Sequence, residues 1–130
     1  MKRTNISSES PFEGVAGFSR AVKTGNIISV AGTAPIAADG STATPGDAYG
    51  QTLRCFEIIQ QAINEAGGSI ENVVRTRIMM TDISLWKEAA KAHGKIFASI
   101  RPACTLVEVS GLIEEDWLVE IEADCILPED

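Results

Sequence analysis

The sequence has little of what membrane and secreted proteins need. None of its apolar runs approaches the length of about 18 to 20 residues that crosses a bilayer, and its N-terminus lacks the apolar segment of a secretion signal. Its three cysteines, an odd number, suggest no disulfide framework. We therefore expect a protein of the reducing cytoplasm with no part embedded in a membrane.

Histidine and clustered basic residues are also scarce. The one histidine, His93, and the three cysteines form no pair at zinc-binding spacing, so we expect no metal site and no cofactor. The formal net charge is -7, and the 11 lysines and arginines are scattered along the chain. Binding to nucleic acid through its phosphates needs clustered positive charge, so the composition argues against nucleic acid as a partner.

What the sequence does have is a large share of aliphatic residues. Hydrophobic residues make up 45% of the 130 residues, whereas aromatic residues make up only 5%. These values are typical of one folded domain, here residues 1–130, with a mostly aliphatic core. We interpret His93, Cys55 and Cys125 as packing residues of that core.

Two kinds of periodicity predict strands and helices in the order ββαβαββ. Alternating apolar residues indicate strands at residues 17–22, 27–33, 73–80, 104–109 and 117–126. Helical spacing indicates helices at about residues 47–66 and 85–99, and residues 1–15 are expected to be irregular. This order predicts an α+β fold, with one largely antiparallel or mixed sheet and both helices on one face. The other face of the sheet is expected to contact another subunit.

The last predicted strand, residues 117–126, has a different chemistry on each face. Its odd-numbered residues are apolar and are predicted to pack on the core. Its even-numbered residues include three carboxylates, Glu120, Glu122 and Asp124. Arg75 and Arg77 share one face of the strand at residues 73–80. They could pair with these carboxylates across the sheet or could bind a ligand, and the sequence leaves both hypotheses open.

Several segments of the chain, taken together and in order, resemble the RidA/YjgF family, whose members are also labelled endoribonuclease L-PSP or translation initiation inhibitor. The segments are residues 17–22, 25–26 with 31–35, 66–68, and 101–123. The resemblance covers nearly the whole chain. It implies a chorismate-mutase-like fold and a homotrimer whose sheets line a central barrel, with clefts between subunits that bind a small metabolite.

The resemblance also implies an activity, but this chain departs from the family pattern at one residue that the activity uses. Studied members hydrolyse enamines and imines, such as 2-iminobutanoate, to 2-keto acids and ammonia. In those members an arginine follows a Pro-Ala pair and holds the substrate carboxylate; here Cys104 follows Pro102 and Ala103. A thiol cannot hold a carboxylate by charge, so we do not expect an arginine-dependent 2-iminobutanoate deaminase. The family's glutamate is present as Glu120, which implies a catalytic role in positioning water.

Five further positions are candidates for ligand binding, and four of them have a simpler alternative. Phe18 stands where the family often has tyrosine. Gly32 and Thr33 could present backbone amides and a hydroxyl to a ligand, or could form a bend at a strand end. Arg101 could replace the missing arginine, or could interact with the end of a helix. Cys104 could contact a ligand, or could be a small apolar filler.

The sequence leaves three functions in view. The first is a hydrolase, similar to a deaminase, that acts on an enamine-like, imine-like or amide-like compound. The second is a non-catalytic protein that binds a metabolite and has a sensing or regulatory role. The third, an endoribonuclease, comes from the family label alone, and the acidic charge balance argues against it. Whether the chain is an enzyme therefore stays open at this point.

Overall fold

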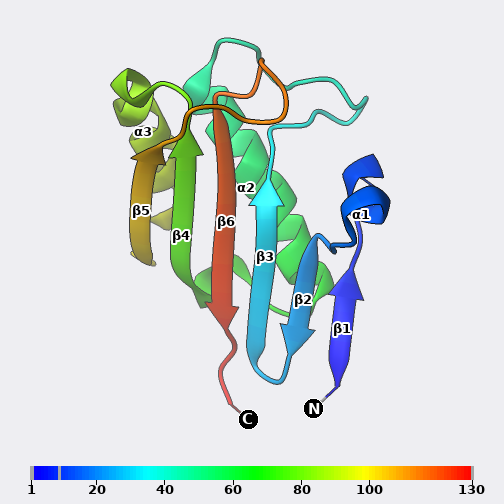
Figure 1. Cartoon of the computed structure of the whole chain (residues 1–130). Coiled ribbons are helices and arrows are strands. Elements are labelled where there is room, and N and C mark those ends of the chain that lie inside the picture. The colour runs from blue at the N-terminus through cyan, green and yellow to red at the C-terminus, as the bar shows by residue number, and fades with distance from the viewer. Residues whose placement is uncertain (1, 9, 130) are drawn as a thin grey trace.

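Six strands form one mixed sheet in the computed structural model, which describes residues 2–8 and 10–129 (Figure 1). Within these residues the strands are β1 (Arg3–Ile6), β2 (Ala21–Thr24), β3 (Ile27–Thr33), β4 (Val73–Met80), β5 (Ala103–Glu108) and β6 (Val119–Ile126). They lie in the order β1-β2-β3-β6-β4-β5. Only β4 and β5 pair in parallel among these neighbours. The sheet is therefore mixed, as predicted.

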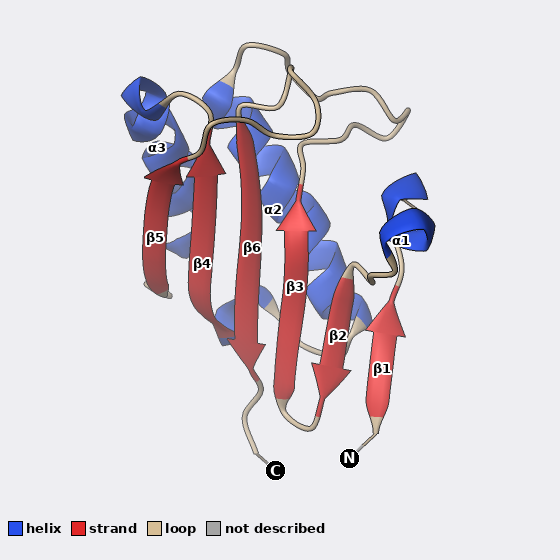
Figure 2. Cartoon of the chain, in the orientation of Figure 1, coloured by secondary structure: helices blue, strands red, loops and turns tan. Residues whose placement is uncertain are grey.

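Two long helices cover one face of this sheet (Figure 2). The helices are α1 (Pro11–Ala16), α2 (Ala48–Glu65) and α3 (Trp86–Phe97), with short 3-10 turns at Ile70–Asn72 and Ile83–Leu85. Helix α2 begins where the sequence predicts, because the Asp47 side chain accepts a hydrogen bond of 3.0 Å from the Gly50 amide. It ends before Gly67, whose φ of 92° suits glycine. The predicted α+β arrangement is confirmed.

The core lies between the sheet and the two long helices. The odd-numbered residues of the last strand region, from Trp117 to Cys125, are all buried, which confirms the predicted apolar face. From the helix side, α2 contributes Cys55, Phe56 and Ile59, each at most 1% exposed. Burial of this aliphatic and aromatic surface is the main favourable term that holds the helices on the sheet.

The N-terminal segment corrects one prediction. Residues 1–15 were expected to be irregular, but they contain β1 and α1. Strand β1 pairs with β2 at the edge of the sheet, where backbone hydrogen bonds hold a strand without an apolar pattern. Helix α1 has a sequence signal that the periodicity did not show: Ser10 caps it and Pro11 occupies its first turn. Met1 and Glu9 lie outside the described residues.

A second correction concerns the start of β4. Its alternation predicts Val74 on the same face as Thr76 and Ile78, with Val73 on the other. In the structure Val73 is 3% exposed and Val74 is 42% exposed. The pairing with β6 shifts register between Val73 and Arg75, so an extra residue reverses the side-chain pattern there.

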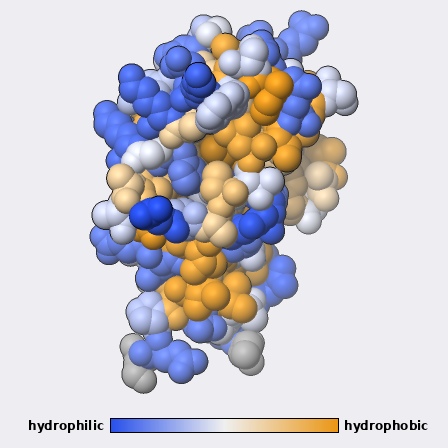
Figure 3. All heavy atoms as spheres, turned by 90° about the vertical axis from the view of Figure 1, so that its left-hand side faces the viewer, coloured by the Kyte–Doolittle hydropathy of each residue, from blue (hydrophilic) through white to orange (hydrophobic). Residues whose placement is uncertain are grey.

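The uncovered face of the sheet carries both apolar residues and ion pairs. Arg77 forms salt bridges with Glu122 at 3.1 Å and with Asp124 at 3.2 Å, which confirms cross-strand pairing for this arginine. Ile27 and Ile126, paired in register on this face, are half exposed. The view from the side of β5 and α3 shows apolar areas that alternate with hydrophilic ones (Figure 3). None of the described helices has the length and apolar character to span a bilayer.

Candidate functional site

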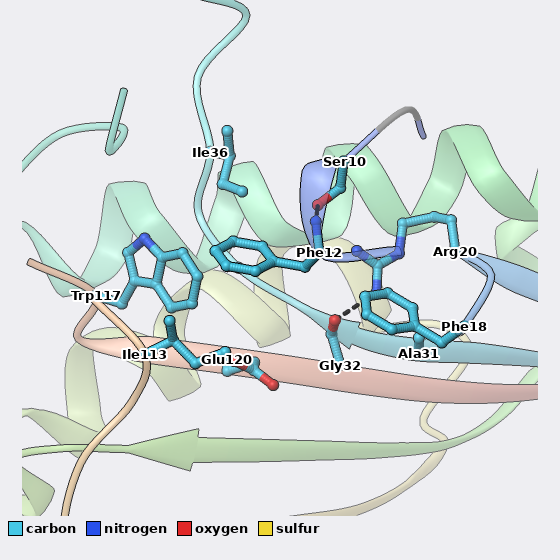
Figure 4. Close-up of a pocket in the computed structure, with 11 residues that line it drawn as sticks. Ser10, Phe12, Phe18, Arg20, Ala31, Gly32, Ile36, Ile113, Trp117 and Glu120 are labelled. Atoms are coloured by element: carbon cyan, nitrogen blue, oxygen red, sulfur yellow. Dashed lines mark hydrogen bonds between the residues drawn. The ribbon is translucent and has the colours of Figure 1, made fainter. Parts of the chain in front are cut away.

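A cavity of about 280 Å³ lies among α1, β3 and the start of β6 (Figure 4). Its wall is mostly apolar and includes the aromatic rings of Phe12, Phe18 and Trp117. Two oppositely charged side chains, Arg20 and Glu120, also line it. An apolar hollow with a few convergent polar groups is the usual form of a small-molecule site, so this cavity is the candidate site.

The backbone of β3 makes room for the carboxylate of Glu120. The pairing of β3 with β6 shifts register between Val30 and Thr33, which places Gly32 beside Glu120. A Cβ atom at residue 32 would collide with the carboxylate oxygen Oε2 of Glu120. Because this oxygen is the end of a flexible side chain, a larger residue at position 32 would move it, so the position of the carboxylate depends on glycine here.

Glu120 has the electrostatic character of a proton-transfer group. It is half-buried on β6, and burial raises the pKa of its carboxyl above the ordinary value. The charge of Arg20 opposes this rise in pKa, and the charge of Glu122 adds to it. A carboxyl with a raised pKa accepts and returns protons closer to neutral pH than an exposed glutamate does, which is what general acid–base catalysis requires.

Arg20 is a buried cation at the cavity. It is 7% exposed, and one of its terminal nitrogens donates a hydrogen bond to the Gly32 carbonyl oxygen. Its Nε is buried and has no hydrogen-bond partner among the described residues. The guanidinium carbon lies 5.8 Å from the centre of the Phe18 ring. Burial lowers the pKa of Arg20, while the charges of Glu13 and Glu120 raise it.

Helix α1 is held beside the cavity by the buried carboxylate of Glu13. This carboxylate accepts hydrogen bonds from the Ser7 hydroxyl and the Ser8 amide, both at 3.0 Å, and from the Ser8 hydroxyl. Burial opposes ionisation of Glu13, but these hydrogen bonds outweigh it and lower its pKa. Phe12 on α1 meets the Trp117 ring edge-on, with centroids 6.4 Å apart. The N-terminal segment is therefore part of the cavity wall.

The structure brings together three of the residues that the sequence singles out. Phe18, Gly32 and Glu120 all line the cavity. Thr33 follows directly but is fully buried, and its hydroxyl donates a hydrogen bond of 2.9 Å to the Ala31 carbonyl oxygen. It does not line the cavity of this chain.

Arg101 and Cys104 lie elsewhere, at the β5 edge of the sheet. Two strands, β4 and β6, separate β5 from β3 (Figure 1). Both side chains are exposed, and neither lines the cavity. Arg101 has a φ of 57°, and its amide donates to the Phe97 carbonyl oxygen at 2.8 Å. A ligand role for either residue stays a prediction that needs a second subunit.

The other ionisable residues that the sequence raises have packing roles here. His93 packs against Phe56 and Phe97, and its Nε2 lies 2.8 Å from the Thr76 hydroxyl. Burial lowers the pKa of His93. Cys55 and Cys125 are fully buried, and burial, followed by the charge of Asp124, raises the pKa of Cys125 to about 11. Among the described residues, no group of three or more His, Cys, Asp or Glu could hold a metal ion.

Phe12, Arg20 and Trp117 are among the cavity residues that sequence reasoning did not select. Trp117 was assigned to the core by alternation, and Phe12 falls in the segment expected to be irregular. Arg20 carries a usable signal, since it is a lone charge between Phe18 and the apolar strand that follows. A charge in such a position is buried with a partner or serves a function, because unpaired burial of a cation is costly.

Comparisons with known proteins agree with this fold. The family model described as Endoribonuclease L-PSP matches residues 8–127. An uncharacterised protein of Streptomyces coelicolor is 38% identical over 119 residues, which is 92% of this chain and 88% of that protein. The 3-aminoacrylate deaminase RutC of Acinetobacter baylyi is 32% identical over 107 residues, which is 82% of this chain and 84% of that protein.

A solved structure extends the likeness to the whole fold. Rv2704 of Mycobacterium tuberculosis, a member of the YjgF/YER057c/UK114 family, matches with a TM-score of 0.88 and 42% identity over 97% of this chain and 100% of that one. The fold is a small α+β domain with a cavity that is lined in part by the carboxylate of Glu120. The chain belongs to the RidA/YjgF family, which confirms the resemblance seen in the sequence.

Proposed function

We propose that this protein hydrolyses a small enamine or imine to a carbonyl compound and ammonia, with Glu120 as the catalytic residue. The observation that carries the proposal is the half-buried Glu120 carboxyl, whose pKa is raised, in a cavity beside Gly32 and Phe18. The likeness to RutC, which acts on the enamine 3-aminoacrylate, supports this class of substrate.

An enamine first becomes the imine as its β-carbon gains a proton and its nitrogen loses one. Hydrolysis of the imine then needs one group that moves protons between oxygen and nitrogen. The Glu120 carboxylate takes a proton from water as the water oxygen bonds to the imine carbon, and the carboxyl then returns that proton to nitrogen. In the resulting carbinolamine, Glu120 moves the hydroxyl proton to nitrogen in the same way. The carbon–nitrogen bond then breaks, and ammonia leaves as the carbonyl forms.

We further propose a homotrimer in which the β5 edge of one subunit faces the cavity of its neighbour. Two features support this arrangement. The uncovered sheet face exposes apolar side chains, among them Ile27, Val107 and Ile126, and exposed apolar surface on a sheet commonly marks an interface. The β5 edge also leaves Arg101 and Cys104 exposed, so a neighbour's ligand could contact them.

Release of ammonia and keto acid tests the proposal directly. The imine would be generated in situ from an amino acid, and its uncatalysed hydrolysis would be subtracted. We expect wild-type protein to accelerate hydrolysis and E120Q to lose about 10²- to 10⁴-fold of that acceleration. Glu57→Gln, an exposed carboxylate change on α2, is the control and should keep full activity. Equal rates for wild type and E120Q would contradict the catalytic role of Glu120.

A second candidate function, metabolite binding without catalysis, is favoured by Cys104. The family position that holds a substrate carboxylate by charge carries a thiol here. Thermal-shift screening followed by analysis of the bound compound separates the two functions. A ligand that raises the melting temperature and is recovered unchanged supports a sensor, whereas conversion supports the hydrolase. The negative net charge continues to argue against the ribonuclease named in the family label.

A further inference from the structure

The cavity has one strongly charged end, formed by the guanidinium of Arg20. A guanidinium has five N–H donors. In the described residues the Arg20 guanidinium makes one hydrogen bond, to the Gly32 carbonyl, and its Nε has no partner although the residue is only 7% exposed. A buried cation with so few acceptors is costly, and an anion with two oxygens matches the planar fork of donors.

The carboxylates near Arg20 leave room for an additional anion. Glu13 already accepts three hydrogen bonds from Ser7 and Ser8, so its oxygens are engaged away from the guanidinium. Glu120 is the other charge that acts on Arg20, and burial favours its neutral form. A ligand anion beside Arg20 would therefore provide the hydrogen-bond acceptors that the protein does not supply to this guanidinium.

The opposite end of the cavity is apolar. In Figure 4, Trp117 and Arg20 lie at opposite ends, with Phe12 and Glu120 between them. Ile36 and Ile113 complete the apolar end. Aromatic rings and branched aliphatic side chains at this end favour an apolar group of matching size, because contact removes apolar surface from water. A ligand with only a methyl group would leave this wall unused.

We propose that the ligand of this cavity is a small carboxylate with a bulky apolar, preferably aromatic, substituent, with Arg20 binding the carboxylate and the wall of Phe12 and Trp117 binding the substituent. This inference rests on the proposed function in one respect, namely that the cavity is the ligand site. It adds the residue that recognises the anion and the substituent that selects the substrate. It also explains how a chain with Cys104 can still bind a carboxylate.

Three stable probes test recognition of the carboxylate and recognition of the apolar substituent separately, and none of them needs turnover. Phenylacetate carries both groups, phenylacetamide lacks the charge, and acetate lacks the ring. Calorimetry or ligand-observed NMR at one pH would give the dissociation constants. We expect phenylacetate to bind at least about tenfold more tightly than either of the others, as the loss of a charged hydrogen bond or of a ring contact predicts.

Substitutions then test which residue recognises the carboxylate and which recognises the apolar substituent. R20Q should weaken phenylacetate about tenfold or more and leave phenylacetamide unchanged. Arg3→Gln, an exposed arginine on β1, is the matched control and should bind as wild type does. W117L should reduce the advantage of phenylacetate over acetate. If R20Q does not fold, R20K keeps the charge but loses the planar fork, and its melting temperature and affinity are measured together.

The outcomes keep this inference apart from the proposed hydrolysis. If phenylacetate binds through Arg20 but no imine is hydrolysed by wild type, the inference stands and the catalytic proposal fails. If small imines are hydrolysed through Glu120 while phenylacetamide binds as tightly as phenylacetate, or R20Q binds phenylacetate like wild type, the catalytic proposal stands and the inference is overturned.

Discussion

The cavity and the β5 edge both carry residues that the sequence marks as functional, but their surroundings differ. In the cavity, Arg20 is buried and Glu120 is half-buried, and burial shifts the pKa of both. At the edge, Arg101 and Cys104 are exposed, and neither lines the cavity. Burial is therefore the physical cause of the shifted pKa values in the cavity, and such shifts are common at functional sites.

The two regions also differ in how they are held in place. The cavity is built from α1, β3 and the start of β6, and hydrogen bonds hold its N-terminal part in place, namely that of Arg20 to Gly32 and those of Ser7 and Ser8 to Glu13. The edge is one strand that pairs with β4 alone among the described strands. Substitutions at the cavity should therefore affect function and stability more than substitutions at the edge of an isolated chain.

Among the substitutions that compare the two regions, the largest effect is expected from G32A. A Cβ atom at residue 32 would displace the Glu120 carboxylate, and misplacement of a catalytic group by about 1 Å can reduce the rate about 10²-fold. Gly94→Ala on α3 is the control, since a Cβ atom there meets nothing within 4 Å and alanine favours a helix. Imine hydrolysis and circular dichroism would be measured on both. Full activity of G32A would show that the carboxylate position does not matter.

A smaller but clear effect on stability is expected from E13A. This change removes the acceptor of three hydrogen bonds and leaves Arg20 with one fewer opposite charge. We expect the free energy of unfolding to fall by about 2 to 3 kcal/mol, measured by urea denaturation. Arg101→Ala, at the exposed edge, should change it by less than about 0.5 kcal/mol. An equal loss of unfolding free energy in E13A and Arg101→Ala would contradict the difference between the cavity and the β5 edge.

The third prediction tests whether a neighbouring subunit joins the regions. C104R would place a guanidinium at the β5 edge. In the proposed trimer it would reach the neighbour's ligand and lower the KM for 2-iminobutanoate about tenfold, because it adds a charged hydrogen bond to the carboxylate. Cys104→Ser keeps about the size of the native side chain, adds no charge, and should leave KM unchanged. If C104R has no effect while sedimentation shows a trimer, the edge does not face the cavity.

The smallest effect is a pH dependence of stability that involves Glu120. Its pKa in the folded chain is raised, chiefly by burial, whereas in the unfolded chain it is ordinary. Between these two values the folded state holds more protons, so its stability falls as the pH rises through that window. E120Q should lack this contribution, which melting curves of both proteins across the pH range would detect. Parallel curves for the two proteins would contradict the raised pKa.

Most of the fold could be predicted from local patterns. Alternation placed the core-facing residues of β6, and the capping signal at Asp47 with glycines after residue 66 bounded α2. The errors at β1 and at the start of β4 have the same origin. Strand β1 is held by pairing with β2 rather than by its own pattern, and the irregularity at Val74 depends on how β4 aligns with β6. Neither partner can be seen from the segment itself.

The sequence by itself determined the family and, from β2 onward, the order of strands and helices, because these depend on residue types and their spacing along the chain. Through the family resemblance it also singled out Glu120 as the carboxylate to examine. Only the tertiary structure decided which residues share the cavity. It added Arg20 and Phe12 to Phe18, Gly32 and Glu120, and it put Thr33, Arg101 and Cys104 elsewhere. The physical reason is that burial and the convergence of charges come from packing between distant segments, which no local pattern records.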